Sequence, residues 1–169
     1  AAQAACAACG ARLWVNDHWA VALACGAYGV HIGQEDLEAM APAALRSLAE
    51  SGTRLGISTH SYAELARALA VRPSYISLGP VFATSSKVVE FAPQGLLAVE
   101  RWRRLVPPDT PFMAIGGISR QVAPEVLRAG ADSIAVISAL TKAPDGLSLA
   151  DATRAWLALW PEGEGGSME

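Results

Sequence analysis

Short apolar runs alternate along the chain with longer stretches that are rich in Ala, Leu, Glu and Arg. The short runs hold β-branched and aromatic residues in nearly continuous apolar sequence, which is typical of strands covered on both faces. We expect strands at residues 12–16, 28–32, 54–58, 75–79, 112–116 and 133–137. We expect helices at residues 19–25, 42–50, 62–70, 96–105, 121–129 and 149–160. This alternation predicts βα units around a parallel sheet, and therefore an α/β fold.

A few residues mark the ends of the expected helices. Ser61 stands just before one helix and Glu64 follows three residues later, which is the pattern of a capping box. Gly52 and Gly130 follow two other helices, at the position where a left-handed residue ends a helix.

Polar or glycine residues follow the carboxyl ends of the expected strands. They are Asn16 and Asp17, then Gln34, Glu35 and Asp36, then Ser58 and His60, then residues 84–87, then Gly116 and Gly117, and finally Ser138. The carboxyl ends of parallel strands share one edge, and ligands bind at that edge in barrels and open α/β sheets. We therefore expect the functional site there.

Composition narrows the class of protein. The chain has 169 residues, of which 52% are apolar and 17% charged, and its formal net charge is −3. These values predict one compact domain, placed at residues 1–160, while the Gly- and Glu-rich residues 161–169 are expected to form a disordered tail. The slightly acidic balance argues against nucleic acid or a membrane surface as a partner, and no apolar run approaches the about 20 residues of a membrane-spanning helix. Three cysteines are too few for a disulfide framework, which favours a cytoplasmic setting.

Asp17 and Asp36 give the most informative chemical signal, because they stand at the ends of neighbouring strands. Two carboxylates in that arrangement would repel each other unless a proton or a cation lay between them. A hard divalent ion such as Mg²⁺, which takes oxygen ligands and keeps waters for a phosphate-bearing substrate, would remove the repulsion. In the alternative interpretation each aspartate caps a neighbouring helix. The residues alone leave both interpretations open.

Two further places could hold a phosphate. Residues 79–87, with the sequence GPVFATSSK, carry three hydroxyls and a lysine, which can bind a phosphate and offset charge on a leaving group, although a plain polar loop is the alternative. Gly117 and Ser138 end the last two strands, where barrel enzymes commonly bind a phosphate. His60 stays open as a general base, whereas His31, inside an apolar strand, is expected to make structural hydrogen bonds.

Seven motifs occur in order along the chain: VND, GVHIGQEDL, LGISTHS, SLGPVFATSSK, APQGL, AIGGIS and AVISAL. In order and spacing they resemble the thiamine-phosphate synthase family, from about residue 1 to about residue 143. The resemblance implies a (β/α)8 TIM barrel that couples hydroxymethylpyrimidine pyrophosphate to a thiazole phosphate and gives thiamine phosphate and pyrophosphate. It implies Mg²⁺ as cofactor and these small molecules as partners.

Carried over position by position, the resemblance also implies roles for individual residues. The magnesium ligands would be Asp17 and Asp36. The pyrimidine pyrophosphate would be held by Asn16, Ser58 and Lys87, of which Ser58 and Lys87 would be catalytic. The thiazole phosphate would be bound by the loop residues Thr84, Ser85 and Ser86, together with Gly117, Ile137 and Ser138.

One departure from the family pattern matters. The family has two more strands and a Q-x-R-x-K motif before VND, so we expect six of the eight βα units here and poor turnover by this piece alone. Open strand edges would also allow homo-oligomers or aggregates to form. Three competing hypotheses stay open: a thiazole tautomerase-like barrel, a non-catalytic phosphate-binding module, and a barrel enzyme for another phosphorylated metabolite. The tautomerase family has a catalytic histidine where this chain has Pro80.

Overall fold

The structure, a computed structural model, describes residues 1–84, 91–142 and 146–160. The strands in these ranges are β1 (Trp14–Asn16), β2 (Gly29–Ile32), β3 (Arg54–Thr59), β4 (Tyr75–Leu78), β5 (Phe112–Ile115) and β6 (Ser133–Ala135). The helices are α1 (Ala2–Ala8), α2 (Trp19–Cys25), α3 (Gln34–Ala39), α4 (Pro42–Ser51), α5 (Tyr62–Ala70), α6 (Gly95–Leu105), α7 (Ala123–Arg128), α8 (Ser138–Thr141) and α9 (Leu149–Leu157). Strands and helices alternate, so the predicted α/β fold class is confirmed.

The helix-end signals read from the sequence are confirmed. The Ser61 hydroxyl accepts a hydrogen bond from the backbone N–H of Glu64 at 3.3 Å, so Ser61 caps α5. Gly52 ends α4 with a left-handed backbone, and Gly130 also has a positive φ directly after the last residues of α7. At these three helix ends the local sequence therefore predicts the structure.

After β1, two short helices lie outside the expected ranges. Residues of α3 include Gln34 and Asp36, which the sequence pattern placed in a polar segment after a strand. Leu37 is the only residue of this helix that is buried, so α3 shows almost no apolar periodicity. Helix α8 is a single turn, which is too short to produce a periodic pattern at all.

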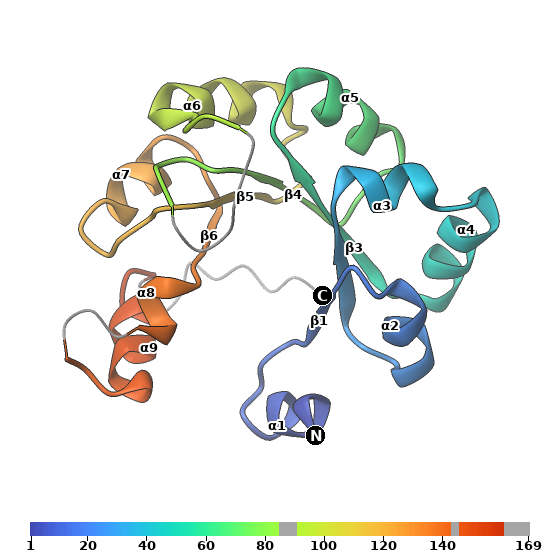
Figure 1. Cartoon of the computed structure of the whole chain (residues 1–169), viewed down its shortest axis with the longest axis horizontal. Coiled ribbons are helices and arrows are strands. Elements are labelled where there is room, and N and C mark those ends of the chain that lie inside the picture. Colours follow the sequence, from blue (N-terminus) through green and yellow to red (C-terminus); the bar gives the residue numbers. More distant parts are fainter. Residues whose placement is uncertain (85–90, 143–145, 161–169) are drawn as a thin grey trace. The chain divides into compact units, whose positions relative to one another are not determined.

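The chain forms two compact units, and we describe each by itself. Unit 1 comprises Ala1–Leu78 and Leu105–Met113, and unit 2 comprises Gly79–Arg104 and Ala114–Glu169. In unit 1 the strands lie side by side in chain order, and β1 to β4 are parallel. Helices α2 to α5 lie along one side of these strands (Figure 1). The core between them holds side chains that are fully buried: Val30, Ile32, Ile57, Ile76 and Leu78.

The opposite face of the same strands carries aromatic and polar side chains. The Trp14 ring meets the Tyr75 ring edge-on with 4.8 Å between centroids, and the His31 ring stacks on Tyr75 at 5.5 Å. Two glycines make room for these rings. A Cβ at Gly29 would collide with the ring of Trp14, and a Cβ at Gly56 would collide with the ring of Tyr75. The large rings therefore lie across neighbouring strands at positions that only glycine leaves open.

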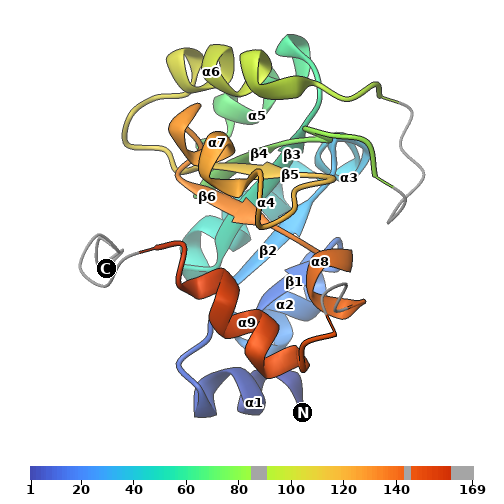
Figure 2. The ribbon, with the colours of Figure 1, turned by 90° about the vertical axis from the view of Figure 1, so that its left-hand side faces the viewer.

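Unit 2 has its own core. The end of β5 lies beside β6, and the fully buried side chains are Val81, Val99, Ala114, Ala123 and Val126. Helices α8 and α9 pack side by side (Figure 2). Over the described residues, none of the helices of the chain combines the length and the apolar character that crossing a membrane requires.

Candidate active site

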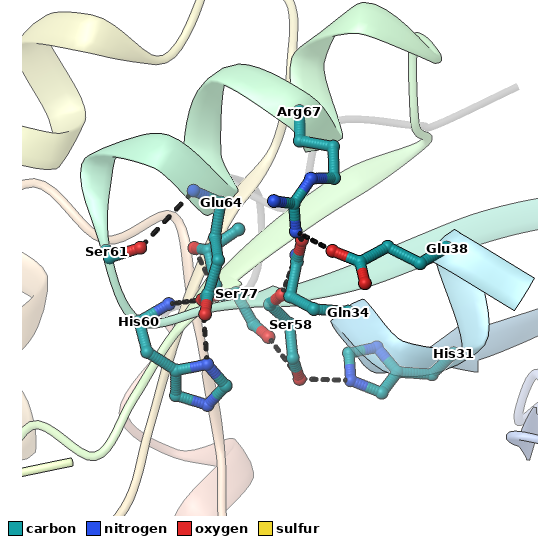
Figure 3. Close-up of polar contacts among 10 residues, drawn as sticks. His31, Gln34, Glu38, Ser58, His60, Ser61, Glu64, Arg67 and Ser77 are labelled. Atoms are coloured by element: carbon teal, nitrogen blue, oxygen red, sulfur yellow. Dashed lines mark hydrogen bonds and ion pairs between the residues drawn. The ribbon is translucent and has the colours of Figure 1, made fainter.

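Ser58, near the end of β3, makes hydrogen bonds through both its side chain and its backbone. Its hydroxyl oxygen lies 2.8 Å from Nε2 of His31 on β2 and 3.4 Å from the hydroxyl of Ser77 on β4 (Figure 3). Its backbone carbonyl accepts a hydrogen bond from the Gln34 side-chain amide at 2.7 Å. Residues from the two neighbouring strands, β2 and β4, and from helix α3 therefore hold Ser58 in place.

A second layer of contacts orients Gln34. The guanidinium of Arg67, on α5, donates to the amide oxygen of Gln34 at 3.1 Å and pairs with the carboxylate of Glu38 at 2.6 Å (Figure 3). Since the Arg67 and Glu38 side chains are 44% and 57% exposed, the ion pair adds little to stability. The hydrogen bond from Arg67 fixes the orientation of the Gln34 amide, and so supports the contact of that amide with Ser58.

His60 follows β3 and is oriented by a carboxylate. Oxygen Oε2 of Glu64 accepts both the backbone N–H of His60 at 2.6 Å and a hydrogen bond from its Nδ1 at 3.0 Å (Figure 3). A carboxylate on Nδ1 places the proton of the neutral ring there, as in other carboxylate–histidine pairs. A general-base role for His60 stays a hypothesis, since it requires a substrate within reach.

Asp17 and Asp36 line the same cavity of unit 1, which has a volume of about 560 Å³. Asp17 has a left-handed backbone with φ of 61°, and its N–H donates to the carbonyl of His31 at 2.8 Å. Asparagine and aspartate adopt that backbone region more readily than other residues with a Cβ. The amide of Asn16 donates to the Asp17 carboxylate at 2.6 Å. The carboxylate is therefore held at the end of β1 by its own neighbour.

The helix-capping interpretation of these aspartates is wrong. Helix α2 has His18 at its N-cap and α3 has Gly33, and neither helix end receives a side-chain hydrogen bond at its cap. Asp36 lies inside the first turn of α3. In the described ranges no group of three or more His, Cys, Asp or Glu residues is placed to hold a metal ion. The two carboxylates fit a hard ion that takes most of its ligands from water and phosphate, as Mg²⁺ does.

Unit 2 contains a separate cavity of about 310 Å³ at the ends of β5 and β6. Its lining includes the expected residues Thr84, Gly117, Ile137 and Ser138. The two strand ends therefore meet in one cavity, as their matched motifs predicted. Ser85, Ser86 and Lys87 lie outside the described residues.

The glycine pair at the end of β5 shapes this cavity. Gly117 has φ of 65°, and a Cβ there would lie 2.9 Å from the carbonyl carbon of Phe82 and closer still to the carbonyl oxygen of Ala83. Gly116 has φ of 101°, and its Cβ would lie 2.6 Å from Cα of Pro80. The backbone can turn this closely under residues 80–83 only without side chains.

Sequence reasoning missed residues at both places. Ser119 and Lys142 also line the cavity of unit 2. Lys142 comes four residues after Ser138, which is one helical turn, so a helix after the last strand would have pointed to it. Tyr75, whose hydroxyl lies 2.7 Å from Nδ1 of His31, was treated only as the first residue of a strand. Gly56 on the neighbouring strand was the available signal, because a small residue in a strand marks a close approach.

The amino-acid sequence is similar to those of known proteins over most of its length. The family model for thiamine monophosphate synthase matches residues 1–140. The chain is 53% identical over 135 residues to the thiamine-phosphate synthase of Cronobacter sakazakii and 52% identical over 135 residues to that of Yersinia pestis. Each match covers 80% of this chain, and it covers 62% and 61% of the two relatives, so the chain spans less than two thirds of their length.

A solved structure agrees with the sequence matches. The thiamine phosphate pyrophosphorylase from Pyrococcus furiosus is similar with a TM-score of 0.70 and 33% identity, over 89% of this chain and 67% of that one. The family match takes in every residue of both cavities named above except Lys142. Because the family model matches residues 1–140, this chain belongs to the thiamine monophosphate synthase family.

Proposed function

We propose that the protein is a thiamine-phosphate synthase, which joins hydroxymethylpyrimidine pyrophosphate to a thiazole phosphate and releases pyrophosphate. The observation that carries the proposal is the family match over residues 1–140, which includes every expected site residue. Membership at 53% identity with a thiamine-phosphate synthase supports the same chemistry here. We further propose that the whole protein has the eight-unit barrel of the family, acts in the cytoplasm, and takes these two small molecules as its substrates.

Asp17 and Asp36 fit a magnesium ion by the chemistry of their donor atoms, and would hold it at the end of β1 and in the first turn of α3. When bound, such an ion neutralises charge on the phosphate oxygens of a leaving pyrophosphate. The part played by Asn16 is to orient the carboxylate of Asp17, to which its amide donates at 2.6 Å. The carboxylate pair then needs little rearrangement to bind.

The chain's own residues would assist the departure of pyrophosphate. Ser58 is held from both its backbone and its side chain, so its hydroxyl can donate to a phosphate oxygen without first being ordered. Lys87 would add a cation to the same group. The carbon–oxygen bond breaks with its electron pair leaving on pyrophosphate, and the thiazole nitrogen supplies the pair for the new carbon–nitrogen bond. Positioning and electrostatics are sufficient for this substitution, so a covalent nucleophile is not required.

The cavity of unit 2 would take the phosphate of the thiazole substrate. Gly117 exposes backbone there because a Cβ would collide with residues 82 and 83, and Thr84 and Ser138 supply hydroxyls. Ile137, 53% exposed, adds an apolar side chain to the lining. Lys142 lines the same cavity and brings a positive charge to it. Ser85 and Ser86 would extend the group of hydroxyls. Hydroxyls, backbone N–H groups and one ammonium match the needs of a phosphate dianion.

The experiment is a coupling assay with the intact protein, both substrates and Mg²⁺, run on the wild type and on Asp36→Ala. We expect thiamine phosphate to form with the wild type and kcat/KM to fall on the order of 100-fold in the variant. Glu35→Ala is the matched control, because Glu35 is an exposed carboxylate one residue away on the same helix turn. Full activity in Asp36→Ala would refute the magnesium assignment.

The competing functions give different outcomes in the same assay. Rearrangement of the thiazole without coupling would favour the tautomerase-like barrel. Binding of a phosphate ligand with no release of pyrophosphate would favour a non-catalytic module. Failure with the pyrimidine substrate, alongside turnover of another phosphorylated metabolite, would favour a different barrel enzyme.

A further inference from the structure

A continuous line of hydrogen bonds crosses three strands on the polar face of unit 1. The hydroxyl of Tyr75 lies 2.7 Å from Nδ1 of His31, and Nε2 of His31 lies 2.8 Å from the hydroxyl of Ser58. The hydroxyl of Ser58 then lies 3.4 Å from that of Ser77. Both nitrogens of the imidazole are therefore engaged, one on each side of the ring (Figure 3 shows the side toward Ser58).

The direction of these hydrogen bonds follows from Tyr75. Among the residues that the structure describes, the only hydrogen-bond partner of its hydroxyl is Nδ1 of His31, so the phenol hydrogen has one acceptor. Burial raises the pKa of Tyr75 to about 12, so the phenol keeps its proton at neutral pH. With the phenol as the donor, Nδ1 is the bare nitrogen of a neutral ring, and Nε2–H donates to the oxygen of Ser58.

Ser58 is left with a hydrogen that cannot point at His31. Within the described part of the chain its acceptor is the hydroxyl of Ser77, and 3.4 Å is well beyond the usual 2.7–2.8 Å of an O–H···O bond. A weak contact of that length is easily exchanged for a better acceptor. The Ser58 hydroxyl is therefore prepared as a donor, with its own acceptor capacity partly used by His31.

We propose that Tyr75 and His31 are positioning residues which fix the hydroxyl of Ser58 as a hydrogen-bond donor to a phosphate oxygen of the pyrimidine substrate. The proposal rests on the proposed function for the identity of that substrate. The two residues act through Ser58 and do not themselves touch the reacting atoms.

The surrounding packing shows that this line is built into the fold. His31, Gly56 and Tyr75 are register partners on β2, β3 and β4, so the Tyr75 ring crosses the bare backbone of Gly56 to reach the imidazole. The two rings stack with 13° between their planes, and the ring of Trp14 also contacts Tyr75 edge-on. A tyrosine held by three neighbours has its hydroxyl in one place.

The first test is spectroscopic and needs no substrate. Long-range ¹H–¹⁵N correlation spectra of the intact protein distinguish the two neutral tautomers of a histidine. We expect His31 to carry its proton on Nε2, and we expect a detectable shift toward the other tautomer in Tyr75→Phe, which loses only the hydroxyl. Tyr28→Phe is the matched control, because the Tyr28 hydroxyl bonds to Arg12 and lies outside the line. A His31 that carries its proton on Nδ1 in the wild type would overturn the proposal.

The second test measures whether Tyr75 acts through Ser58. The probe is inorganic pyrophosphate with Mg²⁺, titrated by calorimetry into the wild type, Tyr75→Phe, Ser58→Ala and the double variant. We expect Tyr75→Phe to weaken binding by about 3- to 10-fold in the wild type, and to have almost no effect once Ser58 is alanine. Equal effects in both backgrounds would contradict the proposal.

The outcomes separate this proposal from the proposed function. Absence of thiamine phosphate in the coupling assay would remove the function, while the tautomer of His31 and the coupling to Ser58 in pyrophosphate binding would still decide the positioning role. Normal coupling activity together with the wrong tautomer would remove only the positioning role.

Discussion

Replacement of Gly117 by alanine should lower the free energy of unfolding for two separate reasons. Gly117 has φ of 65°, and a residue with a Cβ in that backbone region costs about 1–2 kcal/mol. The new Cβ would also lie 2.9 Å from the carbonyl carbon of Phe82, and overpacking of this kind costs about 1–3 kcal/mol. We therefore expect Gly117→Ala to lower the free energy of unfolding by about 2–5 kcal/mol, and to raise KM for the thiazole phosphate.

Gly52→Ala separates the two contributions. Gly52 has φ of 73°, but a Cβ there would meet nothing within 4 Å, so the expected loss of about 1–2 kcal/mol in Gly52→Ala measures the backbone cost alone. Urea denaturation followed by far-UV circular dichroism and tryptophan fluorescence gives both free energies under the same conditions. If Gly117→Ala is no more destabilising than Gly52→Ala, a Cβ at residue 117 does not clash with residues 82 and 83.

Three further predictions concern stability. Because the pKa of Tyr75 rises from 10.0 to about 12 on folding, the native state between these pH values holds a proton that the unfolded chain has lost. The free energy of unfolding should therefore fall as the pH rises from about 10 to 12. Urea titrations at several pH values should show this slope, and Tyr75→Phe should lack it. Leu48→Ala should cost about 2–5 kcal/mol in urea denaturation, because Leu48 is 2% exposed in the core of unit 1; a loss below 1 kcal/mol would mean that the site relaxes around the cavity. Glu38→Ala should change the free energy of unfolding by less than about 1 kcal/mol at low salt and still less at high salt, since its ion pair with Arg67 is exposed; an effect that ignores salt would contradict this.

Much of the fold follows from local sequence signals. The strand Arg54–Thr59 was expected at residues 54–58, and the helix after it starts at a serine with a glutamate three residues later. Such signals depend on residues that are close in the chain, so the sequence alone reveals them. The grouping of Gly117 and Ser138 in one cavity was also predictable, because parallel strands bring their carboxyl ends to one edge.

Contacts between distant residues could not be predicted in the same way. The bond between Tyr75 and His31 joins residues 44 positions apart, and it depends on the register that places Gly56 between them. The contact of Gln34 with the carbonyl of Ser58 depends on a short helix that lacks apolar periodicity. Register and short helices are set by tertiary packing, which a pattern of hydrophobic residues does not specify.

We propose that this protein couples a pyrimidine pyrophosphate to a thiazole phosphate. The most direct measurement is the analysis of products after the intact protein is given both substrates and Mg²⁺, with thiamine phosphate separated by chromatography and pyrophosphate measured in parallel. We expect the two products in equal amounts, with neither formed when one substrate is left out. Pyrophosphate release that does not need the thiazole phosphate, or binding of both substrates without thiamine phosphate, would contradict it.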